Sequence, residues 1–244
     1  MKTHVILAVL LALCASIGIS AKNKKEMFSE ENYGVKNAGT PITIQFEQGK
    51  EHNHPLFAIW LADEKGNYIQ TLYVSETIGK GIFKRASRKT GQWLAGEIQR
   101  PAALPYWAHQ RGVKNEFGTY MPTPKQPIVD AYTGATPQAS FILHSKTEKP
   151  LNGKYKILLE LNQTWDWNEY WTNDKYPDEK EYKTSCQPAL VYSVDIDTNN
   201  PTAEYIMKPI GHSHYSGADG SLNPDLSTIT TALHIAKKIT VKLK

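Results

Sequence analysis

The chain has little cysteine and no long apolar run. Its 244 residues include only two cysteines, Cys14 and Cys186. We expect the segment containing Cys14 to be removed from the mature protein, which would leave Cys186 without an internal disulfide partner. The apolar stretch at residues 5–15 is too short to span a bilayer. Without disulfides, the chain must be stabilised by a hydrophobic core, and it is long enough to form one.

Signals for common enzymes and for nucleic-acid binding are also missing. The sequence contains no G-x-S-x-G motif, no H-E-x-x-H motif and no glycine-rich phosphate loop, which argues against the hydrolases and nucleotide-binding enzymes built on them. The net charge is only +4, and the basic residues are dispersed apart from a small cluster at Lys84, Arg85, Arg88 and Lys89. A solvated loop is the favoured interpretation of this cluster, and a patch that pairs with a flavin phosphate or an acidic redox partner is the alternative. A nucleic-acid partner is therefore not expected.

The N-terminus is typical of an exported protein. Lys2 precedes the apolar stretch, and Ile19-Ser20-Ala21 offers a cleavage site, so residues 1–21 are predicted to be a signal peptide. A lipid anchor on Cys14 is not favoured, because the bulky Leu13 precedes it. The polar residues 22–40 are predicted to form a flexible linker.

Residues 41–244 are predicted to form a single domain. Apolar and polar residues alternate at 42–47, 155–161, 190–196 and 239–243, and a continuous apolar run lies at 56–62. Further strands are expected at 68–74, 139–143 and 205–210. Many short strands joined by turns favour an all-β fold, an antiparallel β-sandwich. Residues 75–136 are predicted to be a long loop-rich insertion with a short helix near Trp107.

Residues 130–136 of this insertion read Asp-Ala-Tyr-Thr-Gly-Ala-Thr, a D-x-x-T-G-A-T motif. From average residue usage, about one chain in a thousand of this length would contain it by chance. Gly134 permits backbone angles that a side chain would forbid, and Ala135 leaves Thr136 uncrowded. Pro137 biases Thr136 towards an extended conformation. The motif therefore predicts an accessible threonine.

This motif resembles the flavinylation site of the FMN-binding subunits of sodium-pumping and Rnf-type redox complexes. The resemblance implies that FMN is bound covalently through its phosphate to Thr136, within a site formed by Asp130, Tyr132, Thr133, Gly134 and Ala135. A flavin transferase (FAD:protein FMN transferase) would perform the reaction. The Thr136 hydroxyl would attack a phosphorus of FAD and expel AMP, assisted by a magnesium ion held by the transferase.

A longer resemblance covers residues 41–165. Five segments follow one another here: residues 57–63, residues 66–72, Pro-Ala-Ala-Leu-Pro-Tyr-Trp at 101–107, the D-x-x-T-G-A-T motif, and Gly-Lys-Tyr at 153–155. Their order resembles that in a family of predicted periplasmic proteins of unknown function. That family is similar in fold to the immunoglobulin-like domain of flagellar hook-cap proteins. The resemblance implies an immunoglobulin-like sandwich, a periplasmic location and a PepSY-type membrane redox partner. The hook-cap W-D-G turn is missing before Gly153, which argues against hook assembly.

Within this interpretation, Trp107 and Tyr106 are candidate flavin neighbours because they lie near Thr136 in sequence, and Tyr132 within the motif is a further candidate. An electron-transfer flavoprotein is favoured over an enzyme with its own substrate. The motif is also compatible with an ordinary turn, in which Asp130 and Thr133 bond to nearby backbone groups. In that case the protein would be an unmodified binding or adaptor module, with the aromatic residues of 165–171 as its contact surface.

A third hypothesis is a metal site at His212-Ser213-His214. Residues i and i+2 of a strand share a face, so two imidazoles could bind one metal. A third ligand would have to come from elsewhere, such as His109, His144 or Asp219. Surface histidines without a metal are the favoured interpretation of this pair and of His52-Asn53-His54.

Overall fold

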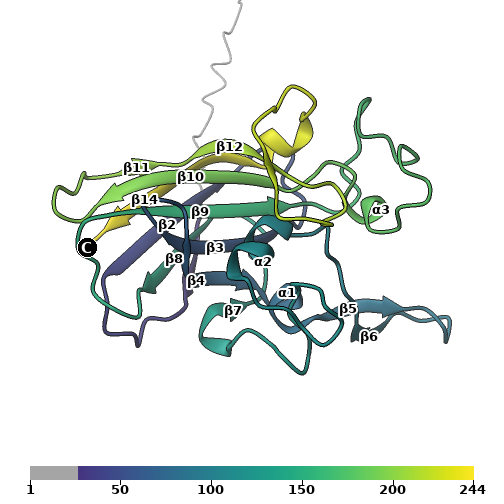
Figure 1. Ribbon diagram of the computed structural model, residues 1–244, viewed down its shortest axis with the longest axis horizontal. Coiled ribbons are helices and arrows are strands. Elements are labelled where there is room, and N and C mark those ends of the chain that lie inside the picture. Colours follow the sequence, from purple (N-terminus) through teal and green to yellow (C-terminus); the bar gives the residue numbers. More distant parts are fainter. Residues whose placement is uncertain (1–26) are drawn as a thin grey trace, which may run out of the picture.

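Two large β-sheets pack face to face in the computed structural model, which describes residues 27–244 (Figure 1). Strands account for 39% of the described residues and helices for 10%, which confirms the predicted all-β sandwich. Two strand pairs, β1–β8 and β4–β7, are parallel, so the sheets are mixed rather than wholly antiparallel. The predicted signal peptide, Cys14 and residues 22–26 of the predicted linker lie outside the described residues.

The strands are arranged in space in an order that differs from their order in the sequence. From one edge to the other, the five-stranded sheet comprises β1 (Ser29–Asn32), β8 (Phe141–Lys146), β2 (Pro41–Gln48), β14 (Ala236–Leu243) and β11 (Tyr205–Ile206). The seven-stranded sheet comprises β13 (Leu222–Asn223), β12 (Lys208–Ser213), β10 (Leu190–Asp197), β9 (Lys154–Asn162), β3 (Leu56–Asp63), β4 (Tyr68–Ser75) and β7 (Thr133–Gly134). A separate hairpin comprises β5 (Ile82–Ser87) and β6 (Leu94–Glu97).

The helices are short and lie in the connections. They are α1 (Glu76–Lys80), α2 (Pro105–Arg111), α3 (Tyr182–Ser185) and the 3-10 turns Asp130–Tyr132 and Thr231–His234. Helix α2 confirms the short helix predicted near Trp107. Pro105 occupies its first turn, where the missing N–H costs nothing, and Gly112 ends it in a left-handed conformation.

The main core lies between the two large sheets. Strand β2 alternates buried and half-buried residues, so Ile42, Ile44 and Phe46 face inward. Phe46 contacts Phe57 of β3 and stacks on Phe141 of β8, each with ring centroids 5.1 Å apart. The alternating apolar positions predicted from the sequence therefore form this core.

A second core covers the opposite face of the seven-stranded sheet. Ala58, Trp60 and Ala62 of β3 pack there against residues of the insertion, including Leu104 and Trp107. Strand β3 is thus buried on both faces, which explains its continuous apolar run. The insertion forms a third layer rather than a loose loop.

Two predictions need correction. The predicted linker contains β1, which pairs with β8 at the edge of the five-stranded sheet. Its residues are mostly exposed, so the strand carries no hydrophobic pattern. The single strand predicted at 205–210 is divided between the sheets: β11 pairs with β14, whereas β12 pairs with β10.

Candidate functional site

The D-x-x-T-G-A-T segment lies at the edge of the seven-stranded sheet. Asp130–Tyr132 form a 3-10 turn, and Thr133–Gly134 form β7, which pairs in parallel with Val74 and Ser75 of β4. β7 is therefore the last strand of the sheet, and the chain leaves the sheet directly before Ala135 and Thr136.

The Thr136 hydroxyl lies between the sheet edge and solvent. Its Oγ1 donates a hydrogen bond to Ser75 Oγ at 3.1 Å, and Thr136 is half-buried. Ala135 and Gln138 are exposed on either side. Pro137, which follows directly, is buried. The side chain is therefore held by Ser75 on the sheet side and keeps part of its surface exposed.

The remaining motif residues also have structural contacts. Asp130 is 86% exposed and forms an ion pair with Lys80 at 3.1 Å. Thr133 is buried. The Tyr132 hydroxyl donates to Glu148 Oε1 and accepts from Asn37 Nδ2, both at 3.0 Å. These contacts fix the conformation of the loop that presents Thr136.

Two tyrosines outside the motif hold this loop. A Cβ added at Gly134 would lie 1.7 Å from Tyr33 Oη, so only glycine fits there. The Tyr73 hydroxyl donates to the carbonyl oxygens of Gly134 and Ala135 at 3.3 and 3.2 Å. The two tyrosine rings lie 5.1 Å apart, and burial raises the pKa of Tyr73, which keeps its hydroxyl a neutral donor. Sequence reasoning missed both, because Tyr33 lies in the predicted linker and Tyr73 has the pattern of an ordinary core residue.

The Trp107 ring has no free face that a flavin could contact. It is completely buried in the second core, and its indole N–H donates to Thr71 Oγ1 at 3.0 Å. A ring with no exposed surface has no face on which a flavin could stack. Tyr106 is half-buried on α2 and packs against Trp60 of the second core. Of the residues predicted as flavin neighbours, only Tyr132 lies on the motif loop and is partly accessible.

A buried carboxylate supports the helix that carries Trp107. Glu160 of β9 is fully buried and accepts the backbone N–H groups of Tyr106 and Trp107 at 3.1 and 2.7 Å. These N–H groups have no partner within the helix, because they belong to its first turn. Burial raises the pKa of Glu160 to about 8, and the two N–H groups oppose that shift.

The paired histidines do not converge on a common point. His212 is buried against Trp171, and its Nδ1 donates to the Ser213 carbonyl at 2.8 Å. Strand β12 ends at Ser213, so His214 lies beyond the strand and stacks on Tyr215 at 4.4 Å. Within residues 27–244, no group of three His, Cys, Asp or Glu residues could hold a metal ion. The structure therefore gives the metal hypothesis no support.

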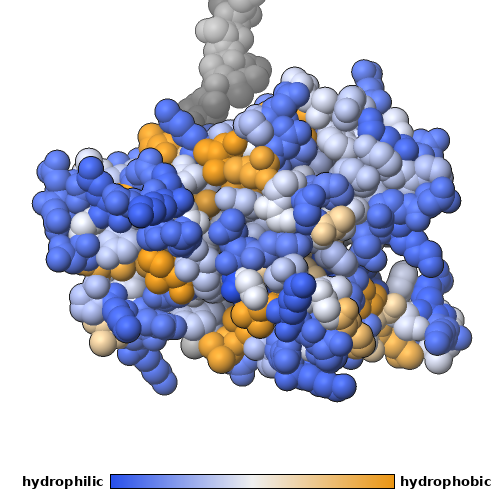
Figure 2. Space-filling view, viewed as in Figure 1, coloured by the Kyte–Doolittle hydropathy of each residue, from blue (hydrophilic) through white to orange (hydrophobic). Residues whose placement is uncertain are grey.

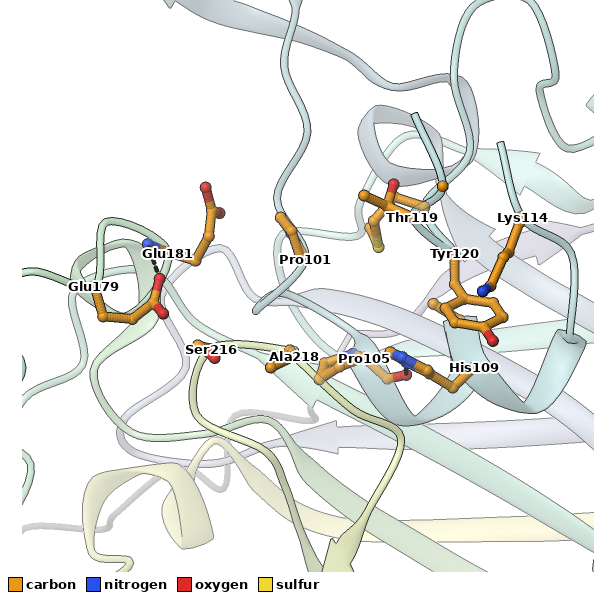
Figure 3. Close-up of a pocket in the computed structure, with 14 residues that line it drawn as sticks. Pro101, Pro105, His109, Lys114, Thr119, Tyr120, Glu179, Glu181, Ser216 and Ala218 are labelled. Atoms are coloured by element: carbon orange, nitrogen blue, oxygen red, sulfur yellow. Dashed lines mark hydrogen bonds between the residues drawn. The ribbon is translucent and has the colours of Figure 1, made fainter. Parts of the chain in front are cut away.

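A pocket of about 400 Å³ lies between α2 and the loops at 114–121, 179–181 and 216–218 (Figure 3). Glu179 and Glu181 lie at one end, and Lys114, Tyr120 and His109 at the other (Figure 3). The Glu179 carboxylate accepts the Glu181 N–H at 3.1 Å. None of the motif residues contributes to this pocket.

Comparisons with protein-family models, with curated proteins and with solved structures find no match. In the part of the chain that the structure describes, no helix has both the length and the apolar character required to cross a membrane.

Proposed function

We propose that this protein is an exported, periplasmic flavoprotein that carries FMN covalently on Thr136 and relays electrons with a membrane redox partner of the PepSY type. The observation that carries the proposal is the placement of Thr136: its hydroxyl lies on a fixed loop, with Ala135 and Gln138 exposed beside it, immediately after the edge strand β7. A modifying enzyme must reach this hydroxyl, and the sheet edge leaves one side of it open.

The attachment is a phosphoryl transfer. A bond forms between Thr136 Oγ1 and the phosphorus of the FMN half of FAD, and the bond from that phosphorus to AMP breaks. The hydroxyl proton passes to a base of the flavin transferase, because a threonine hydroxyl is a weak nucleophile by itself. This chain contributes the positioned hydroxyl, and no side chain of the loop has to act as a base.

When bound, FMN supplies one- and two-electron transfer. A covalent bond prevents its loss and keeps it at a high local concentration. The Asp130 carboxylate and the Tyr132 hydroxyl already bind Lys80, Glu148 and Asn37, so their part is to hold the loop that carries the attached group. Trp107 is not a flavin contact because it is buried.

The direct test is co-expression with a flavin transferase, followed by a denaturing gel viewed for flavin fluorescence. We expect a fluorescent band for the wild-type chain and none for Thr136→Ala. Thr90→Ala is the matched control, since Thr90 is an exposed threonine on the β5–β6 loop, and it should keep the band. A dark wild-type band, beside a fluorescent band from a protein that the same transferase is known to modify, would reject the proposal.

A second function, an unmodified adaptor, is favoured by the loop at 163–176. Trp165, Trp167 and Tyr170 are 69%, 56% and 50% exposed, and Trp165 has an unfavourable φ of 56°. Exposed rings on a fixed loop are typical of a contact surface. The adaptor hypothesis predicts no fluorescent band, and it predicts that the protein retains its partner after Thr136→Ala.

A further inference from the structure

The β5–β6 hairpin stands apart from both large sheets. Its strands pair with each other, and they project from one end of the molecule (Figure 1). No residue from 82 to 97 is buried and most are exposed, so little of the protein covers the hairpin. A two-stranded hairpin is only marginally stable by itself in water, and a surface on which to pack would stabilise it.

The hairpin carries mostly positive charge. Lys84, Arg85, Arg88 and Lys89 are exposed, and the one acidic residue of the hairpin is Glu97 at the end of β6, paired with Ile82 at the base. Within residues 27–244, none of these four cations forms an ion pair. Their charge is therefore free to attract an anionic partner.

Large apolar side chains lie among these cations. Ile82, Trp93 and Leu94 are 44%, 53% and 44% exposed. The Arg88 guanidinium lies 5.7 Å from the Trp93 ring centroid. Hydrophobic side chains next to charged ones are visible at the end of the molecule that carries the hairpin (Figure 2). The hairpin thus offers a partner both positive charge and apolar surface.

We propose that the β5–β6 hairpin docks the protein on an anionic lipid surface. Basic side chains are attracted to the headgroups of anionic lipids, while Trp and Leu enter the boundary between headgroups and acyl chains. Trp is suited to this boundary because its ring is apolar and its N–H is polar. The proposal does not depend on FMN, although docking would bring the protein close to a membrane partner.

Sedimentation of the full chain with vesicles tests the proposal. The decisive comparison is between two double variants, Arg88→Gln/Lys89→Gln on the hairpin and Lys65→Gln/Lys154→Gln on exposed sites elsewhere. Both remove the same charge and keep the same N-terminal segment. On phosphatidylglycerol-containing vesicles at low salt, we expect the hairpin variant to bind about thirtyfold more weakly than wild type and the control to bind as wild type does.

Two further measurements complete the test. Trp93→Ala should weaken binding to the same vesicles, and high salt should weaken wild-type binding, because attraction between exposed charges is screened. Equal weakening by the two double variants, or no wild-type binding to anionic vesicles, would overturn the proposal and leave an acidic protein as the partner of this hairpin. Thermal unfolding of each variant shows whether the body of the protein stays folded.

Discussion

Gly134 and Thr136 belong to the same motif, but packing in the fold constrains the residue type much more strongly at Gly134. Gly134 is required by packing, because Tyr33 occupies the space that a side chain would need. Thr136 has no comparable packing role, since its hydroxyl makes one hydrogen bond, to Ser75, at the edge of the sheet. An ordinary turn would explain the glycine, whereas the only side-chain hydrogen bond of the half-exposed threonine in the described structure is the one to Ser75.

Substitution of Gly134 tests the packing argument. Gly134→Ala places a Cβ 1.7 Å from Tyr33 Oη, so we expect it to destabilise the protein by about 1–3 kcal/mol in urea unfolding. Tyr33→Ala in the same chain removes the clash, so the double variant should be less destabilised than the sum of the single changes. Strict additivity would contradict the contact. Gly96→Ala is the control, because its added Cβ comes no closer than 3.2 Å to Ala86.

At the level of elements, the insertion acts as a covering layer held by helix α2. The helix is anchored at its first turn by Glu160 and in its middle by Trp107, which reaches Thr71 of β4. Without this layer, Trp60 and the neighbouring small residues of β3 would face water. The insertion is therefore part of the folded core, and the candidate site is built on its edge.

Removal of the Trp107 side chain tests whether the insertion stabilises the fold. Trp107→Ala leaves a large cavity in the second core, and we expect a loss of about 3–5 kcal/mol in the free energy of unfolding. Trp93→Ala, at an exposed tryptophan of the hairpin, should change it by less than about 0.5 kcal/mol. A small effect at Trp107 would mean that the insertion does not stabilise the domain. Thr136 flavinylation of folded Trp107→Ala protein should persist.

Periodicity in the sequence was sufficient to predict most central strands. Residues 42–47 and 239–243 lie in strands and were predicted from alternating apolar positions, and residues 56–62 lie in a strand predicted from a continuous apolar run. It failed for β1, whose pairing with β8 involves backbone groups and polar side chains. It also failed for Glu160, since alternation placed this residue on a solvent face that the insertion in fact covers. The apolar Leu158 on the same strand and Trp107 in the insertion were the sequence signals that this face is covered.

For the candidate site, the sequence specified the motif but not its surroundings. The partners of the motif come from distant segments: Ser75 and Tyr73 from β4, Tyr33 from the predicted linker, and Glu148 from the β8–β9 connection. Such contacts depend on how the sheets are assembled. The burial of Trp107, which leaves it no free ring face, likewise depends on the assembled layers and not on its distance from Thr136 in sequence.

For the whole molecule, burial of Glu160 predicts a dependence of stability on pH. Its pKa is raised from 4.5 in the unfolded chain to about 8 in the fold, because desolvation disfavours the charged form. The folded state then retains a proton that the unfolded state has lost. This contribution to stability is fully present below about pH 4.5 and is lost as the pH rises to about 8.

Urea unfolding at about pH 5 and about pH 8.5 measures this contribution. We expect wild type to lose stability between the two values, and Glu160→Gln to lose less, because its side chain does not ionise. Burial also raises the pKa of Asp166 and of Glu181, so the informative quantity is the difference between the two proteins. Identical pH dependence in both would show that Glu160 is not the group responsible.

The proposed electron relay depends on modification of a single hydroxyl. The intact mass of the protein purified from cells that contain an active flavin transferase, combined with peptide mapping, measures it most directly. We predict a mass increase equal to FMN less one water, located on the peptide that contains Thr136 and absent from Thr136→Ala. An unmodified mass, from cells in which the transferase modifies a second flavoprotein, would contradict the proposed function.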